Sequence, residues 1–395
     1  MEILLKLANS GKNLNVFKKN INNSGLKIKE LDNLFLFYKD KNIANNDFTN
    51  DIIKELDGVI IDKNNLKIVC YSVNYNYYDI NLLKLNNELL HVSILLEGSL
   101  IRVYYYNNKW NYSTKKCIDA KTTYWISNKN YYELFYDSIN GFDLESILNI
   151  NYCYSFLLIH SENDVVIRCK EKMLYHLNTY DITTLTIVDK CYLNVPNIKY
   201  IPYYTIDGNN IIQHINNRKN NIVYDSIGLL ITDSENRKYK IMDESYVQLK
   251  TLWGNTNNRF MRYLELRKDI ELLKSYLSYF KEDKELFIDF ENRVNKYSYI
   301  LLEVYIAKYI KRTNILIPYY MKKIIYMLHG DFIKTSIKTD FGKIMMKFLE
   351  IDAKFLLFMI THHNRAEENI KNIQSSTVID YDTTYLDIDD NMKDE

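Results

Sequence analysis

Proline and glycine are scarce in this sequence, which has three prolines and ten glycines among its 395 residues. The five cysteines form no Cys-x-x-Cys pair and have no partner histidines at metal-ligand spacing, so we expect no metal site and a reducing compartment. No run of about 18 uncharged apolar residues occurs, which argues against a membrane partner. Lysine plus arginine (51) balance aspartate plus glutamate (50), so any binding to nucleic acid must be local. The composition favours a cytoplasmic protein.

Short strand-like segments dominate the chain from about residue 30 to residue 250. They are rich in β-branched and aromatic residues and are separated by turns rich in Asn and Asp. The segments are LFLFY, GVIID, LKIVCYS, SILLEG, LIRVYYY, KWNYS, FLLIHS, DVVIRC, TTLTIVD, SIGLLITD and RKYKIMD. Asn107-Asn108 is typical of a hairpin turn, and residues 128–149 have helical character. This half is therefore predicted to be α+β with much antiparallel sheet.

After Trp253 the pattern becomes helical. Residues 257–363 predict four or five helices, with breaks near 281–283, at Pro318 and around Gly330. The last stretch is acidic and patternless, as in a disordered tail. The predicted organisation is an α+β domain over 1–253, an all-α domain over 254–370 and an acidic disordered tail over 371–395.

Four segments resemble, in order, the nucleotidyltransferase motifs of the ATP-dependent RNA ligases of phages and some large DNA viruses. The segments are residues 55–61 with the strand that follows, 93–101, 156–167 and 227–250. The resemblance implies an antiparallel-sheet nucleotidyltransferase (ATP-grasp-like ligase adenylation) domain followed by an all-α C-terminal domain. It also implies a role in the RNA metabolism or replication of a virus or another cytoplasmic element, which places the protein in the host cytoplasm if it is viral.

The residues at the nucleophile motif depart from that family. Ligases of this kind attack the α-phosphate of ATP with a lysine amine, and the matching position holds Leu95, whose alkyl side chain has no lone pair. Glu97, Gly98 and Ser99 continue the motif. The resemblance therefore implies a vestigial nucleotide pocket without a catalytic residue, in which ATP and Mg are cofactors only if activity is retained.

Other motif positions are also altered. Asp57 stands where the family has an arginine, and Leu157 stands where it has a carboxylate. The fourth motif is reduced to Asp225-Ser226, and one lysine of the fifth motif, Lys240, is kept. Because phosphoryl transfer depends on cations and carboxylates around the developing charge, these substitutions predict an inactive enzyme.

The predicted hairpin after the nucleophile motif interleaves basic and aromatic residues, a mixture that can track phosphates and stack bases. The candidate nucleic-acid-binding residues are Arg102, Lys109, Trp110, Lys115 and Lys116. An ordinary hairpin with one core face and one solvated face explains the same pattern.

Three functions follow from these patterns. The first is an inactive, RNA-ligase-like protein that binds RNA or DNA or serves as a scaffold for replication or RNA-processing proteins. The second is an active RNA ligase in which Lys115 or Lys116 replaces the missing nucleophile. The third is an interaction module such as a polymerase accessory subunit, with the helical half and the acidic tail as contact surfaces.

Overall fold

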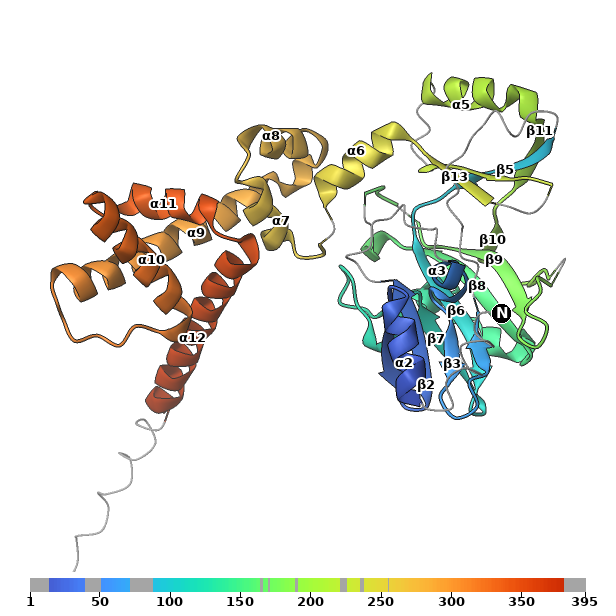
Figure 1. Cartoon of the computed structure of the whole chain (residues 1–395), viewed down its shortest axis with the longest axis horizontal. Coiled ribbons are helices and arrows are strands. Elements are labelled where there is room, and N and C mark those ends of the chain that lie inside the picture. Colours follow the sequence, from blue (N-terminus) through green and yellow to red (C-terminus); the bar gives the residue numbers. More distant parts are fainter. Residues whose placement is uncertain are drawn as a thin grey trace, which may run out of the picture. The chain divides into compact units, whose positions relative to one another are not determined.

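The computed structural model divides the chain into two compact units, Met1–Thr251 and Leu252–Glu395 (Figure 1). It describes residues 14–39, 51–71, 88–163, 166–169, 171–188, 191–220, 226–234, 238–254 and 256–379. The division falls two residues before the boundary expected from the sequence. Each unit is considered by itself below.

Three sheets form the first unit. Sheet A has the order β1 (Leu26–Leu31), β2 (Leu34–Lys39), β3 (Ile60–Asp62), β4 (Ile68–Cys70). Sheet B has the order β11 (Tyr203–Asp207), β5 (Leu89–Leu95), β12 (Gly228–Thr232), β13 (Lys238–Met242). Sheet C has the order β10 (Ile198–Tyr200), β9 (Met173–Asp181), β8 (Tyr152–Ile159), β6 (Ser99–Tyr106), β7 (Lys109–Thr114). All neighbours are antiparallel except β10 and β9, so the α+β prediction with mainly antiparallel sheet is confirmed.

Strands β2 and β3 of sheet A are buried on both faces, and this explains the continuous apolar run of β2. Phe35 and Phe37 pack with Phe17 of α2 (Leu14–Asn23) on one face, together with residues of α3 (Asp51–Leu56). Leu34 and Leu36 point to the other face, where they meet side chains of sheet C. Because successive side chains of a strand alternate between faces, one apolar run serves two cores.

The outer face of sheet C is covered by α4 (Tyr131–Ser138), whose Leu134 and Phe135 pack in one core with side chains of β6 and β8. A reciprocal capping box starts this helix: Asn130 Oδ1 accepts from the Glu133 N–H (2.9 Å), and the Glu133 carboxylate accepts from the Asn130 N–H (2.8 Å). The helix expected over 128–149 is thus α4 followed by a short 3-10 turn, Leu144–Ile147.

Sheet B packs its apolar face against α5 (Ile211–Asn220). Its strand β5 leads, through residues 96–98, directly into β6 of sheet C. This three-residue link between two sheets is the part of the fold on which the candidate site is built.

Two expected strands are not formed in the described residues. In the segment DVVIRC, the N–H groups of Val166 and Ile167 donate to the Glu97 carboxylate instead of to a strand. In TTLTIVD, the Asp181 carboxylate accepts from the N–H groups of Thr183 and Thr184, which makes a turn and leaves a single bridge at Ile187. Side-chain acceptors, one distant in the sequence (Glu97) and one local (Asp181), therefore overrode β propensity in these two places.

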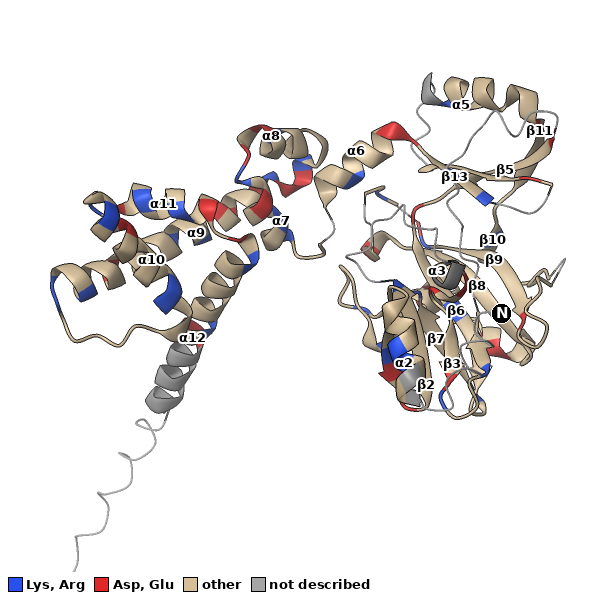
Figure 2. Ribbon diagram, viewed as in Figure 1, with Lys and Arg blue, Asp and Glu red and all other residues tan. Residues whose placement is uncertain are grey.

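The second unit, as far as it is described, is helical. After α6 (Glu244–Trp253), which spans the division, its α-helices are α7 (Arg259–Leu266), α8 (Ile270–Tyr279), α9 (Lys284–Tyr305), α10 (Tyr319–Thr335), α11 (Phe341–Glu350) and α12 (Ala353–Ile379). The break expected around Gly330 is wrong, because α10 continues to Ser336, whose φ of 56° ends it. Basic and acidic residues are interspersed along these helices (Figure 2).

The predicted tail is also corrected in part. Residues 371–379 belong to α12, where the sequence has no proline or glycine to stop the helix, and residues 380–395 lie outside the described part. None of the described helices has the length and apolar character needed to cross a membrane.

Candidate functional site

Residues 96–98 run close against β8. An added Cβ at Gly98 would lie 2.7 Å from the Leu158 carbonyl oxygen and 2.9 Å from Leu157 Cγ, so only glycine permits this approach. Leu95, the last residue of β5, pairs with Gly228 of β12. The position expected to carry a nucleophile is therefore an ordinary strand position at the edge of this link.

Glu97 connects the link to two other segments. Its Oε2 accepts from the N–H groups of Val166 (2.9 Å) and Ile167 (2.7 Å), and its Oε1 accepts from the Tyr246 hydroxyl (2.6 Å). Lys250 Nζ lies 3.5 Å from the same Oε1, and the side chain of Glu97 is 10% exposed. Burial and the charge of Glu97 raise the pKa of Tyr246, which stays a neutral donor. The carboxylate is thus saturated by donors from within the protein.

A cavity of about 570 Å³ lies beside this link, a volume within the range of small-molecule sites. One part of its wall is apolar and another part is polar. The lining residues are Ile94, Leu96, Glu97, Gly98, Leu158, Ile159, His160, Asn163, Ile167, Arg168, Cys169, Glu171, Met173 and Tyr175.

Asn163, which lines this cavity, has a buried side-chain acceptor without a hydrogen-bond partner among the described residues. Its side chain is 7% exposed, and its Nδ2 donates to Ser99 Oγ (3.3 Å). Its Oδ1 has no partner within the part of the chain that the structure describes. A buried acceptor left unpaired costs about 1–3 kcal/mol, so a ligand that brings an N–H or O–H donor to Asn163 would be favoured.

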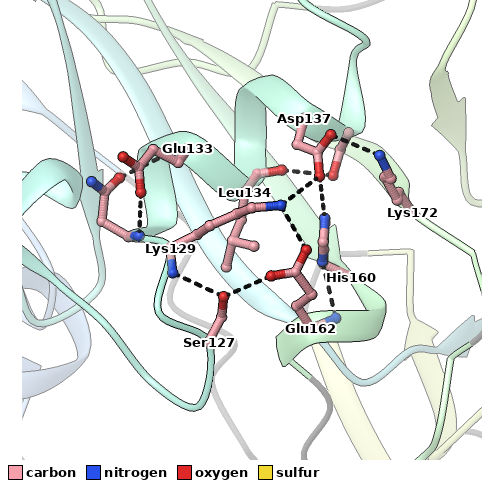
Figure 3. A network of polar contacts seen from close by, with 10 residues as sticks. Ser127, Lys129, Glu133, Leu134, Asp137, His160, Glu162 and Lys172 are labelled. Atoms are coloured by element: carbon pink, nitrogen blue, oxygen red, sulfur yellow. Dashed lines mark hydrogen bonds and ion pairs between the residues drawn. The ribbon is translucent and has the colours of Figure 1, made fainter.

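His160, which also lines the cavity, belongs to a polar network shown in Figure 3. Its Nε2 lies 3.0 Å from Asp137 Oδ2, and its Nδ1 accepts from the N–H of Glu162 (3.1 Å). Because Nδ1 is an acceptor, the ring carries its proton on Nε2 and donates it to Asp137. Lys172 Nζ lies 2.7 Å from Asp137 Oδ1, and this hydrogen bond is the main cause that lowers the pKa of Asp137 to about 2.

The ligand atoms of Asp137, His160 and Glu162 lie within 4.8 Å of one another, which is a spacing compatible with a metal ion. Two ammonium groups already neutralise the carboxylates, since Lys129 Nζ lies 2.6 Å from Glu162 Oε1 and Lys172 binds Asp137. Both ring nitrogens of His160 are also engaged. The set fits an ion-pair network and not a metal centre.

The cavity brings together only part of the predicted pocket. Glu97 and Gly98 line it, and Ser99 contacts it through Asn163. Lys240, on β13, is not among the lining residues, and burial, followed by the charge of Lys115, lowers its pKa. Asp225 lies outside the described residues. Magnesium-bound ATP does not fit the lining as it stands, because Glu97, a carboxylate at the motif, is saturated.

The predicted nucleic-acid-binding residues divide into buried and exposed groups. Arg102 is a correction: it is fully buried and donates to the carbonyl oxygens of Gly58 and Thr114 (2.7 Å to Thr114), so its guanidinium cannot meet a phosphate. Lys115 lies 2.6 Å from Asp57 Oδ2. Lys109 and Lys116 are exposed.

The exposed residues lie on or just after β7, an edge strand of sheet C. Lys109 begins the strand, and Lys116 follows its end. Trp110 is half-buried and packs against the core of sheet C, with its ring 5.3 Å from that of Tyr105. Lys109, Trp110 and Lys121 also line a small groove of about 160 Å³. Of the predicted nucleic-acid-binding residues, Lys109 and Lys116 at this edge of sheet C are the ones exposed enough to contact a phosphate.

Asp137, His160, Asn163 and Lys172 were not predicted as site residues. The signal for two of them was present, because the polar run His-Ser-Glu-Asn follows directly after the apolar strand β8. Asp137 and Lys172 come from other segments and carried no local signal.

The fold is a unit of helices and mainly antiparallel sheets followed by a helical unit. No protein-family model matches the sequence. A curated relative, the "Immediate-early protein ICP-46 homolog" of Invertebrate iridescent virus 3, is 28% identical over 193 residues, which cover 43% of this chain and 38% of the relative. The chain therefore matches well under half of that protein.

Solved structures of an RNA ligase from Naegleria gruberi are also similar to this chain. The ligase with PPi has a TM-score of 0.32 at 13% identity, over 43% of this chain and 54% of that chain. A mutant without ligand has a TM-score of 0.36 at 13% identity, over 46% of this chain and 58% of that one. Likeness at this level carries no argument about what this chain does.

Proposed function

We propose that this protein is a non-catalytic, RNA-ligase-like binding protein. Its cavity beside residues 96–98 holds a small polar ligand, and the basic edge of β7 contacts RNA or DNA. The observation that carries the proposal is the lining of the cavity: within the described chain, no lysine lines it, and Ile94 and Leu96 flank Leu95 at the motif. Without an amine among the described lining residues, the cavity offers no group that could take up a nucleotide covalently.

The proposal includes a viral or cytoplasmic-element setting, in replication or RNA metabolism. It is supported by the motif resemblance in the sequence and by the relative from an iridescent virus, an immediate-early protein homologue by name. The engaged carboxylate of Glu97 supports the loss of chemistry, because three hydrogen-bond donors and one ion pair hold it in a structural role.

The active-ligase alternative is less well supported. Lys115 Nζ is held in an ion pair with Asp57 Oδ2 at 2.6 Å, and Lys115 is not among the residues that line the cavity. Lys116 is exposed and does not line the cavity.

Covalent chemistry is tested with ATP labelled at the α-phosphate, in the presence of magnesium or manganese. We expect no label that survives denaturation. A stable adenylate lost in Lys115→Ala or Lys116→Ala would establish the active-ligase alternative and overturn the proposal.

Nucleic-acid binding is tested by fluorescence anisotropy with single-stranded RNA and DNA over a range of salt concentrations. The double variant Lys109→Glu, Lys116→Glu should weaken binding and reduce the salt dependence by about one unit of slope for each lost phosphate contact. Lys67→Glu, at an exposed lysine directly before β4, is the control for a change of charge elsewhere on the first unit. Equal weakening in the control, or copurification with a polymerase and no binding to bare nucleic acid, would favour the accessory-subunit alternative.

A further inference from the structure

A pair of cysteine thiols meets inside the first unit, between sheets A and C. Cys70 of β4 and Cys153 of β8 are 83 residues apart in the sequence, yet their Sγ atoms lie 3.5 Å apart. Both side chains are fully buried, and Ser113 Oγ of β7 lies 3.9 Å from Cys70 Sγ. The two thiols are in van der Waals contact across two different sheets.

Arg102 of β6 places a positive charge in the same interior. Its guanidinium is fully buried and donates to the carbonyl oxygens of Gly58 and Thr114. Within the described residues, no carboxylate pairs with it. A buried cation without a counter-charge is unfavourable, so this environment favours an anion on a neighbouring group.

The thiol of Cys70 is the group whose pKa is affected by this buried charge. Burial alone raises its pKa, but the contact with the Cys153 thiol, the charge of Arg102 and the hydroxyl of Ser113 outweigh burial and bring the pKa to about 7. Burial and the proximity of Cys70 raise the pKa of Cys153. Among the described residues, Tyr104 of β6 is a titratable group in the same buried cluster, and burial raises its pKa, so it remains neutral. The pair thus joins a thiolate to a thiol, the combination used by reactive dithiols.

We propose that Cys70 and Cys153 form a reversible dithiol–disulfide site that cross-links β4 to β8 when the protein meets a peroxide. The Cys70 thiolate attacks one oxygen of hydrogen peroxide, and the O–O bond breaks. The other oxygen departs as hydroxide, and Cys70 becomes a sulfenic acid. The Cys153 sulfur then attacks that sulfur, the S–O bond breaks, and the oxygen leaves as water with the proton of Cys153. Two thiols are oxidised by two electrons, and the peroxide is reduced to two waters.

The two sulfurs start close to bonding distance. A disulfide needs an S–S separation of about 2.05 Å, so the sulfurs must approach by roughly 1.5 Å, which rotations of two side chains can supply. The bond would close a loop of 83 residues and tie sheet A covalently to sheet C.

The test oxidises the full-length protein with hydrogen peroxide under native conditions, followed by peptide mapping without reductant. We expect a Cys70–Cys153 linked peptide that a thiol reductant removes, and a midpoint of thermal unfolding for the first unit that rises by roughly 5–10 °C. Cys70→Ser and Cys153→Ser should abolish both effects. Cys169→Ser and Cys191→Ser, which change the two less buried cysteines, are matched controls and should keep them.

A second variant tests the electrostatics without removing a thiol. Ser113→Ala should slow disulfide formation severalfold at pH 7 and leave it almost unchanged at pH 9, where Cys70 is ionised in either protein. Arg102→Met should have a larger effect if it folds. The proposal is overturned if the linked peptide forms only in denaturant, if other cysteine pairs form equally well, or if Cys169→Ser removes the effect.

Discussion

The two units bury different kinds of side chain. In the described part of the first unit the buried polar residues include Arg102, His160 and His176, whereas in that of the second unit they are Asp283, Ser298 and Thr339. Asp283 has its partners nearby: the Tyr276 hydroxyl donates to it (2.6 Å), and Arg259 Nη1 lies 3.1 Å away. Around these groups the second unit is filled by packed aromatic rings.

Both cavities described above are lined by residues of the first unit. Buried groups that can titrate or accept a ligand therefore coincide with space for a ligand in that unit. The comparison directs the search for chemistry to the first unit, whereas the described part of the second unit buries mainly packed aromatic and aliphatic side chains. The predictions below test this division, beginning with the largest effect.

Truncation of one core side chain in either unit should destabilise that unit and leave the stability of the other unchanged. Phe156→Ala, in the core of sheet C, should destabilise the first unit by about 3–5 kcal/mol, and Leu301→Ala, in α9, should destabilise the second by about 2–5 kcal/mol. Hydrogen exchange read by mass spectrometry should show lost protection only in the mutated unit. If either variant loosens both units equally, the division into independent units fails.

Acid should weaken the first unit through His176. Burial lowers its pKa from 6.5 to about 4, so the unfolded chain binds the proton more readily between these values. The stability of the unit should be constant above about pH 7, fall by about 3 kcal/mol as the pH falls from 6.5 to 4, and level off below. Urea unfolding across this range measures the change.

His176→Gln keeps a side chain that can hydrogen-bond Thr179 but does not titrate, so it should flatten this part of the pH curve. His91→Gln, at an exposed histidine, should leave the curve as it was. A curve with the same slope in His176→Gln would assign the acid effect to other groups.

Glu97→Gln should destabilise the first unit by about 2 kcal/mol. The amide keeps one oxygen acceptor but loses the charge that strengthens hydrogen bonds from Val166, Ile167 and Tyr246. Glu171→Gln, on the same cavity, should change stability by less than about 0.5 kcal/mol. A neutral Glu97→Gln would show that the carboxylate is free for a ligand, which would reopen the question of catalysis.

The strands were predictable where the apolar pattern decided the structure. The hairpin at Asn107-Asn108 is an example, since both residues adopt positive φ (53° and 57°), as the two-residue turn requires. The pattern failed at Val166 and Ile167, because the acceptor that captures their N–H groups, Glu97, is 69 residues away from the nearer of them. A local window cannot contain such a partner.

The candidate site was predictable only in its sequence-local part. Residues 97–99 followed from one motif, but the pairing of His160 with Asp137 and of Cys70 with Cys153 depends on how the strands are ordered in sheet C and packed against sheet A. For Arg102, by contrast, the sequence predicted a binding residue that packing makes inaccessible. Its neighbours in sequence indicate a solvated basic hairpin, whereas the packing of sheet A over β6 buries it.

The smallest predicted effect concerns Asp137. Its pKa is lowered to about 2 by Lys172 first and by His160 and Lys129 in addition, so the folded state holds the carboxylate ionised where the unfolded chain would protonate it. The resulting stability is fully present above the unfolded pKa near 3.8 and is lost as the pH falls through about 2. Because the side chain is 30% exposed and solvent screens the pair, we expect about 1 kcal/mol.

Asp137→Asn should therefore lower stability at pH 5 and converge with the unmodified protein near pH 2, as followed by thermal unfolding of the first unit. Asp289→Asn breaks an exposed pair with Arg293 in α9 and should show no such convergence in the first unit. If Asp137→Asn were instead more stable at pH 5, the two lysines would not be structural partners of the carboxylates. The cluster of Asp137, His160 and Glu162 would then have to be reconsidered as a metal site.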